Sequence, residues 1–421
     1  MLWVLAFGGS IRLRSSLFQG VIDRVQSQQP AQPPIGIAKA HRAYLCLDDF
    51  ERAARRRLPY MLEAYVAEGA ETNASLLGNR ESFARYALLP RAPCDVSKRR
   101  QDVTLLGERY AHPFGIAPMG MSAACAYRGD LALAKAAEDA KIPMIVSAAS
   151  LIALEEIKKI APSVWFQAYL PGEPDRIEAM LDRVAAAQFQ TFVLTVDVPV
   201  LSNREHYIRS GFSVPLRPSM KLFWQGVSRP RWLFGTALRT LVNHGMPHFE
   251  NLDAKRGPAF LSQEAFRRFE QRDTLSWQSV SLMRRLWKGK LILKGILSPA
   301  DAVKARDNGV DGIIVSNHGG RQLDCAAAPL RVLPEIRELS GNMAVMLDSG
   351  IRRGTDVLKA MALGAEFVFL GRPFLYAAIV GGKAAVSHAV TLLVQEIDRD
   401  LALLGVNSLS EIGSEHLVES C

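Results

Sequence analysis

The sequence predicts an α/β fold of the (β/α)8 type, with helices before the barrel and a long insertion after its fourth strand. Short apolar runs rich in β-branched residues recur along the chain, and they are typical of parallel strands that are buried on both faces. There are eight such runs, at residues 114–117, 144–147, 165–169, 191–196, 291–294, 312–316, 344–347 and 367–370. Most gaps between them carry a helical pattern, whereas the gap between residues 197 and 291 is far longer than the rest.

The gaps predict helices with recognisable ends. Helical patterns occupy residues 130–140, 174–187, 299–308 and 355–363, and one more is expected near 277–287. Ser298 stands at an N-cap position, Pro299 in the first turn and Gly309 after the end, which is the usual punctuation of a helix. Strands that alternate with helices form a parallel sheet, and eight units indicate a closed TIM barrel rather than an open sheet.

The N-terminal part of the chain divides in two. Residues 1–43 carry arginine, serine and glutamine with Asp23 as the only acid, so we expect an extension that is disordered or serves targeting. Residues 44–69 predict two helices, one opened by Asp48 and Asp49, which suit the helix dipole. Pro59 begins the second, which carries Tyr65. The barrel domain is expected to span residues 44–421.

Composition excludes several classes of protein. The five cysteines are scattered without a C-x-x-C spacing, which argues against a disulfide framework and a metal site and favours a reducing, cytoplasmic compartment. The net charge of +9 is spread along the chain without a nucleic-acid motif, so nucleic acid is not an expected partner. No apolar run reaches the roughly 18 residues that a membrane span needs.

The insertion, residues 206–270, mixes aromatic and basic side chains. They are Phe223, Trp224, Arg229, Arg231, Trp232, Phe234 and Arg239. Rings that sit at the lipid headgroups beside cations that meet anionic lipid are typical of a peripheral membrane contact. A lid packed over the active site is the alternative, and both interpretations stay open here.

One stretch, residues 312–324, organises the candidate site. An apolar strand runs into Ser316, Asn317 and His318, and Arg321 follows after two glycines. An imidazole can take a proton near neutral pH, and a guanidinium can hold a carboxylate through two parallel hydrogen bonds. The pair therefore predicts a site for a small anionic molecule.

Candidate site residues, most of them polar, stand where the predicted strands end, and in a barrel those ends meet at one site. These residues are Ala117, Pro118, Met119, Gly120, Ser147, Gln167, Tyr169, Thr195, Asp197, Arg204, Lys294, Ser316, His318, Arg321, Asp348, Ser349, Gly350, Arg352, Gly371 and Arg372. Charged groups inside apolar strands are costly without partners, so we expect a bound anionic group.

Three parts of this cluster can be assigned. Arg352 and Arg372, with backbone amides after strands 7 and 8, suit a phosphate. Arg204 and Arg321 suit a substrate carboxylate. The remaining polar groups suit a flat heteroaromatic cofactor attached to that phosphate, and they are Ser147, Gln167, Thr195 and Lys294. No G-x-G-x-x-G follows the first strand, which disfavours a dinucleotide on a Rossmann unit.

Four motifs resemble the FMN-dependent L-2-hydroxy acid oxidase and dehydrogenase family, which includes glycolate oxidase and respiratory L-lactate dehydrogenase. They are Ser-Asn-His-Gly-Gly-Arg-Gln-Leu-Asp at 316–324, Thr-Val-Asp-Val-Pro at 195–199, Ile-Leu-Lys-Gly at 292–295 and Asp-Ser-Gly-Ile-Arg-Arg-Gly at 348–354. The resemblance covers residues 44–420 and implies FMN as the cofactor.

The resemblance also implies roles. His318 becomes the base, oriented by Asp197, and Arg204 and Arg321 become the carboxylate clamp. Tyr65 and Tyr169 would contact the substrate. Lys294 would lie against the N1–C2 carbonyl edge of the flavin. The residues that would contact the flavin ring and the ribityl chain are Ser147, Gln167, Thr195 and Ser316. Those that would contact the FMN phosphate are Arg352, Gly371 and Arg372.

Departures from the family pattern bear on substrate and electron acceptor. Met119-Gly120 stands where short-chain oxidases carry Thr-Ala, and Ala149 stands where glycolate oxidase-like members carry tryptophan, which predicts room for a larger side chain. The segments 226–232 and 404–412 are more similar to respiratory lactate dehydrogenase. We therefore expect a dehydrogenase that passes electrons to a quinone on the inner face of the plasma membrane. The expected substrate is a lactate-like 2-hydroxy acid, with mandelate and longer aliphatic acids left open.

Two alternatives remain. One is a soluble oxidase that reduces O2 to hydrogen peroxide, and the other is a non-redox phosphate-binding barrel. The resemblance also implies a homo-oligomer, with a tetramer as the usual state.

Overall fold

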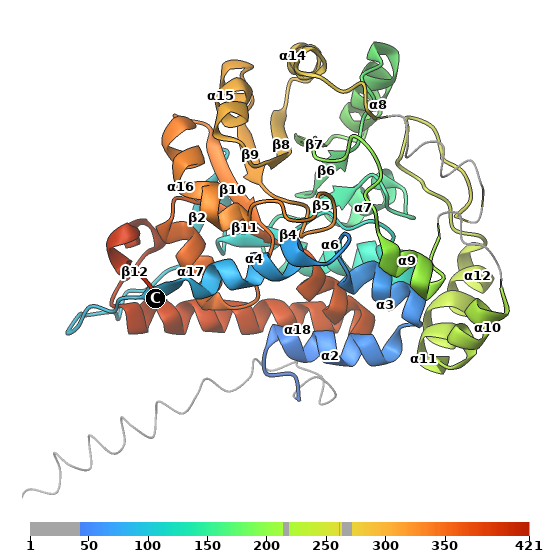
Figure 1. Ribbon diagram of the computed structural model, residues 1–421, viewed down its shortest axis with the longest axis horizontal. Helices are drawn as coiled ribbons and strands as arrows, with labels where there is room; N and C mark the ends of the chain where they lie inside the picture. Colours follow the sequence, from blue (N-terminus) through green and yellow to red (C-terminus); the bar gives the residue numbers. More distant parts are fainter. Residues whose placement is uncertain (1–42, 214–218, 261, 263–271, 421) are drawn as a thin grey trace, which may run out of the picture. The chain divides into compact units, whose positions relative to one another are not determined.

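Eight parallel strands form the centre of the structure (Figure 1). The computed structural model describes residues 43–213, 219–260, 262 and 272–420. The strands are β4 (Phe114–Ile116), β5 (Ile145–Ser147), β6 (Trp165–Ala168), β7 (Thr191–Thr195), β8 (Lys290–Ile296), β9 (Gly312–Val315), β10 (Ala344–Asp348) and β11 (Phe367–Leu370). They run in the order β4-β11-β10-β9-β8-β7-β6-β5, and a parallel bridge from Ile116 to Met144 joins the two ends. The predicted TIM barrel is confirmed.

Helices between the strands cover the outside of the barrel. They are α5 (Ser122–Cys125), α6 (Gly129–Asp139), α7 (Leu154–Ile160), α8 (Pro174–Ala186), α14 (Trp277–Leu286), α15 (Pro299–Asp307), α16 (Pro329–Leu339), α17 (Gly354–Ala362) and α18 (Arg372–Leu404). The predicted helix ends are confirmed at α15, where the Ser298 hydroxyl accepts a hydrogen bond from the Asp301 N–H at 3.4 Å.

A separate apolar cluster fills the inside of the barrel. Trp165, Ala344 and Phe367, each the first residue of its strand, pack there with the hairpin of β2 (Val103–Leu105) and β3 (Glu108–Tyr110). The indole N–H of Trp165 donates to the Tyr110 hydroxyl at 3.3 Å. The hairpin thus closes the N-terminal end of the barrel, which leaves the opposite end for a ligand.

The N-terminal helices and the C-terminal segment lie against the barrel. They are α2 (Leu47–Arg57), α3 (Tyr60–Ala67), α4 (Ala74–Ala84), β1 (Tyr86–Leu88), η3 (Leu409–Glu411), η4 (Ser414–His416) and β12 (Leu417–Glu419). Strand β1 pairs antiparallel with β12. The predicted extension lies outside the described residues except for residue 43.

Helix α18 is long and apolar enough to cross a membrane by length and composition. It packs against α2 and α6 (Figure 1), and half of its most apolar window is buried. Its backbone breaks from helical geometry at Gly381 and Gly382. This packing is that of a helix in the outer layer of the barrel.

The predicted insertion begins with a group of short helices (Figure 1, green to yellow). They are α9 (Glu205–Ser210), α10 (Met220–Val227), α11 (Pro230–Trp232), the π-helical η2 (Leu233–Leu238) and α12 (Arg239–His244). Two of the aromatic and basic residues noted in the insertion turn inward: the Trp232 indole donates to the Ala124 carbonyl at 2.9 Å, and Arg229 donates to the Leu58 carbonyl at 3.0 Å. Residues 214–218, 261 and 263–270 of the insertion lie outside the described part.

Asp324, the last residue of the His-Gly-Gly motif, fixes the start of helix α4. Its carboxylate accepts from the Thr72 N–H at 2.9 Å, the Thr72 hydroxyl at 2.5 Å and the Ser75 N–H at 2.9 Å. These hydrogen bonds lower its pKa to about 2, although burial alone would raise the pKa. Nearby, Asn317 and Asn79 exchange two amide hydrogen bonds of 2.7 and 2.8 Å. The motif thus anchors α4 to the barrel.

We expect Asp324→Ala to lower the free energy of unfolding by about 2 kcal/mol, because several N–H groups at the start of α4 lose their acceptor. Thermal and urea unfolding would measure the change. Since the pKa of Asp324 is lowered, its contribution should be complete above pH about 4 and fade as the pH falls toward 2. Asp307→Ala, at an exposed position, is the matched control, and equal losses in both variants would contradict the assignment.

Candidate active site

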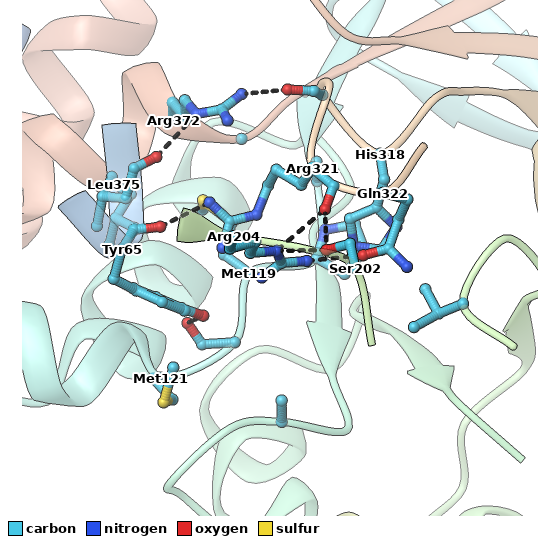
Figure 2. Close-up of a pocket in the computed structure, with 18 of the residues that line it drawn as sticks. Tyr65, Met119, Met121, Ser202, Arg204, His318, Arg321, Gln322, Arg372 and Leu375 are labelled. Carbon is cyan, nitrogen blue, oxygen red and sulfur yellow. Dashed lines mark hydrogen bonds between the residues drawn. The ribbon is translucent and has the colours of Figure 1, made fainter. Parts of the chain in front are cut away.

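A cavity of about 800 Å³ opens at the C-terminal end of the barrel (Figure 2). It gathers most residues that the sequence predicts for the site. Those lining it are Tyr65, Ala117, Pro118, Met119, Gly120, Tyr169, Arg204, Lys294, His318, Arg321, Asp348, Ser349, Gly350, Arg352, Gly371 and Arg372. Of the other predicted residues, Ser147, Gln167 and Thr195 lie on strands β5, β6 and β7. Asp197 and Ser316 contact the lining residues His318 and Lys294.

His318 and Asp197 form a hydrogen-bonded pair at the rim. The imidazole Nδ1 lies 3.0 and 3.2 Å from the two carboxylate oxygens, and the Tyr169 hydroxyl lies 3.4 Å from Nε2. Burial lowers the pKa of His318, against the opposing effect of Asp197. With Nδ1–H directed at the carboxylate, a neutral imidazole leaves Nε2 as the proton acceptor on the cavity side.

Asp197 itself is mostly buried, and burial would raise its pKa. The nearby His318 and Lys294 outweigh that effect and lower the pKa. Gly295 makes room for this carboxylate: its φ is +106°, and a Cβ there would lie 2.6 Å from Cβ and Cγ of Asp197. The register of β8 and β9 shifts at this residue, and such bulges often re-aim side chains beside active sites.

Lys294 provides a buried positive charge. Its ammonium lies 2.9 Å from an Asp348 carboxylate oxygen and donates to the Ser316 hydroxyl at 2.8 Å. Burial would lower the pKa of Lys294, but Asp348 and Asp197 outweigh burial and raise it. The lysine therefore keeps its charge inside the barrel.

Ser316 and Ser349 tie this lysine to the loop that carries His318. The Ser316 hydroxyl accepts from the His318 N–H at 3.0 Å. The Ser349 hydroxyl accepts from the Gly319 N–H at 3.0 Å and donates to Asp348 at 2.9 Å. Hydrogen bonds thus link Lys294 through Ser316 to the His318 loop, and link that loop through Ser349 to Asp348, which pairs with Lys294.

Arg204 and Arg321 lie side by side at the opening (Figure 2). Arg204 donates to the Ser202 hydroxyl at 2.7 Å and to the Gln322 side chain at 2.7 Å. Arg321 donates to the Tyr65 carbonyl at 2.6 Å. The structure thus brings both predicted clamp residues to one place.

Tyr65 and Gly120 lie on the apolar side of the cavity. The Tyr65 hydroxyl donates to the Gly120 carbonyl at 3.0 Å. A Cβ at Gly120 would lie 2.8 Å from the Ala149 Cβ and 3.3 Å from the Tyr65 hydroxyl. Glycine at 120 therefore allows this backbone to pack directly against Ala149 and Tyr65.

The far end of the cavity carries the predicted phosphate site. Gly371 is the N-cap of α18, where helix N–H groups favour an anion. Arg372 donates to the Val66 and Gly319 carbonyls at 2.8 and 2.9 Å (Figure 2). Burial, then the neighbouring Arg321, lowers the pKa of Arg372 to about 10. An anion bound here would reverse that effect.

Several buried polar atoms have no hydrogen-bond partner among the residues that the structure describes. They include both side-chain polar atoms of Gln167, the Thr195 hydroxyl and Nε of Arg352. Buried groups of this kind are costly unless a ligand or water satisfies them. Their placement, with polar strand ends at one end and cations at the other, fits a flat ring that carries a phosphate.

Tyr207 and Arg272 are among the cavity residues that sequence reasoning missed. Tyr207 lies three residues after Arg204 on α9, and Arg272 lies with its guanidinium carbon 4.3 Å from the centre of the Tyr169 ring. Both line the cavity. The i, i+3 spacing of Tyr207 from Arg204 was the available signal for the first, whereas no motif marks the second.

A model of the FMN-dependent dehydrogenase family matches residues 54–419. The chain belongs to this family. The (S)-mandelate dehydrogenase of Pseudomonas putida is 36% identical over 372 residues, covering 88% of this chain and 93% of that protein. A Mycobacterium tuberculosis protein with the provisional name L-lactate dehydrogenase is 36% identical over 380 residues, covering 90% of each chain.

Solved structures agree with this membership. The monotopic membrane protein (S)-mandelate dehydrogenase superposes with a TM-score of 0.83 at 34% identity, covering 90% of this chain and 100% of that chain. Mandelate oxidase with benzoylformic acid superposes with a TM-score of 0.74 at 33% identity, covering 90% and 99%. The chain is therefore an FMN-dependent 2-hydroxy acid dehydrogenase, and the predicted family and cofactor are confirmed.

Proposed function

We propose that this enzyme oxidises an L-2-hydroxy acid to the 2-oxo acid with His318 as the base. The observation that carries the proposal is the His318–Asp197 pair beside Arg204 and Arg321 in one cavity. Bound FMN supplies the acceptor for the electron pair that leaves C2 of the substrate.

The protein residues divide the remaining work. Arg204 and Arg321 hold the substrate carboxylate, which fixes C2 and its hydroxyl relative to His318. Nε2 of His318 takes one proton, from C2 in a carbanion route or from the hydroxyl in a hydride route. Asp197 stabilises the imidazolium that results. Lys294 would supply fixed positive charge to the cofactor ring as that ring gains electrons.

Two small residues of the cavity lining, Gly120 and Ala149, support a substrate with a large side chain. They contact each other, since a Cβ at Gly120 would press on Ala149, and they line the cavity together with Met119 and Met121. The relatives include (S)-mandelate and L-lactate dehydrogenases. We infer that a mandelate-sized acid fits better than lactate, the smaller candidate that the sequence suggested.

Anaerobic bleaching of the flavin with a panel of L-2-hydroxy acids, from lactate to mandelate, tests the reaction. We expect at least one acid to bleach the flavin, and His318→Gln to slow bleaching by about 100-fold or more while FMN stays bound. His244→Gln, at an exposed position of the insertion, is the control. An undiminished rate in His318→Gln would contradict the base assignment. Reoxidation by air rather than by a quinone would favour the oxidase alternative.

The pH dependence of flavin reduction follows from the lowered pKa of His318. Since the base acts when neutral, the rate should rise with pH through a midpoint below 6.5 and then level off. Asp197 favours the charged imidazole, so Asp197→Asn should lower the plateau and move the midpoint to lower pH. A midpoint that moves to higher pH would contradict this arrangement. Asp307→Asn should leave the profile unchanged.

The first helices of the insertion support a peripheral membrane contact. Their exposed apolar side chains form a set that we term the insertion face: Ile208, Met220, Phe223, Trp224, Phe234 and Val242. Lys221, Arg231 and Arg239 are exposed among them. Together they suit a bilayer with anionic headgroups, and a solved relative is a monotopic membrane protein. We propose that this face rests on the inner face of the plasma membrane, where a quinone accepts the electrons.

The homo-oligomeric state stays a prediction.

Vesicle sedimentation tests this contact. The purified enzyme should sediment with vesicles of anionic lipid more than with neutral ones, because cations add to apolar burial. The double variant Phe223→Ser, Trp224→Ser should lose most of this binding while it still reduces flavin with substrate. Leu403→Ser, at a comparably exposed apolar position on α18, is the control. Unchanged sedimentation of the double variant would exclude the insertion face as the contact.

A further inference from the structure

Tyr207 joins the two guanidinium groups of the carboxylate clamp. Its hydroxyl oxygen accepts a hydrogen bond from Nη2 of Arg321 at 2.6 Å and another from Nη1 of Arg204 at 2.9 Å. The residue lies on α9, which belongs to the insertion rather than to a barrel strand. One neutral oxygen thus bridges two cations that come from different loops.

The bridge leaves donors available for a ligand. Arg321 uses Nη1 on the Tyr65 carbonyl, and Arg204 uses Nε on Ser202 and Nη2 on Gln322. Each terminal guanidinium nitrogen carries two hydrogens. Nη2 of Arg321 and Nη1 of Arg204 therefore each keep a second hydrogen beyond the one given to Tyr207. A carboxylate can take those hydrogens without displacing the phenol.

Packing fixes the Tyr207 ring. It meets Phe212 edge-on, with centroids 4.9 Å apart and planes at 70°, and it meets Tyr65 at 5.9 Å. Its own hydroxyl hydrogen points at the Tyr65 carbonyl, 3.3 Å away. Because aromatic contacts and a third hydrogen bond hold the ring, the bridging oxygen keeps a fixed position between the two arginines.

The chemistry of the bridging group is suited to this task. Two guanidinium groups repel each other at close range, and the partial negative charge of a phenol oxygen reduces that repulsion. A carboxylate in the same place would also neutralise one of the positive charges and compete with the substrate. The phenol carries no net charge, so both positive charges remain for the substrate.

We propose that Tyr207 is a positioning residue that sets the separation and orientation of Arg204 and Arg321 for recognition of the substrate carboxylate. The inference rests on the proposed function, because it assumes that this pair binds a carboxylate. It adds a residue of the insertion to the substrate site, so that the insertion serves binding as well as membrane contact.

Tyr207→Phe tests the inference, because it keeps the ring and removes only the bridging oxygen. The probes are phenylacetate and phenylacetamide, which share a shape, differ in charge and carry no hydroxyl to oxidise. In titrations followed by the flavin spectrum, the Kd of phenylacetate should rise about tenfold, as expected for loss of charge-assisted hydrogen bonds that hold the clamp. The Kd of phenylacetamide should change less than about twofold. With a substrate, KM should rise while the limiting rate of flavin reduction stays nearly unchanged.

Tyr127→Phe is the matched control, since that hydroxyl bonds His244 at 3.0 Å outside the cavity. Equal weakening of both probes in Tyr207→Phe would mean a general structural role and would overturn the inference. Unchanged or tighter phenylacetate binding would do the same, and tighter binding would show that the phenol competes with the ligand. If the wild type does not bind phenylacetate more tightly than phenylacetamide, the assignment of Arg204 and Arg321 as a carboxylate clamp is wrong. If no 2-hydroxy acid bleaches the wild type but the probes behave as expected, the proposed reaction fails and the role of Tyr207 stands.

Discussion

The buried ion pair between Lys294 and Asp348, with 2.9 Å between ammonium and carboxylate, sets the geometry of the active site. Taking both charges out of water is costly unless further hydrogen bonds satisfy them. Ser316 supplies one to the lysine and Ser349 supplies one to the aspartate. Both hydroxyls also hold backbone N–H groups of the loop that carries His318. The same hydrogen bonds therefore satisfy the buried charges and position the loop that carries His318.

The backbone around these hydrogen bonds is unusual. His318 has a φ of +58° and Ser349 one of +80°, values that non-glycine residues rarely adopt. Gly295, at +106°, allows Asp197 to approach. Such conformations cost free energy and persist where surrounding contacts determine them. Here the hydrogen bonds of the serines and the anchoring of α4 to the loop provide those contacts.

The sequence was sufficient for the barrel and for the main site residues because both follow from local rules. Alternating strands and helices imply strand ends at one rim, so His318, Lys294 and Arg321 could be placed together from the sequence. Long-range geometry could not be predicted in this way. That Tyr207 meets both arginines depends on how α9 packs against α3, and that Trp232 turns inward depends on a carbonyl of α5. The spacing of Tyr207 from Arg204 was one signal within the segment, but nothing there marks the contact with Arg321, and nothing around Trp232 marks its contact with Ala124.

Helix α9 connects the two halves of the proposed function. Tyr207 on one side of it contacts the clamp, while the next residue, Ile208, is 80% exposed on the insertion face and also lines the cavity. Leu201, 44% exposed, lines the same opening. The mouth of the cavity therefore has an apolar margin toward the insertion face and a cationic interior. In the proposed function, a polar acid reaches the cavity from solution and an apolar electron acceptor reaches it from a bilayer. The cationic interior suits the acid, and the apolar margin suits the acceptor.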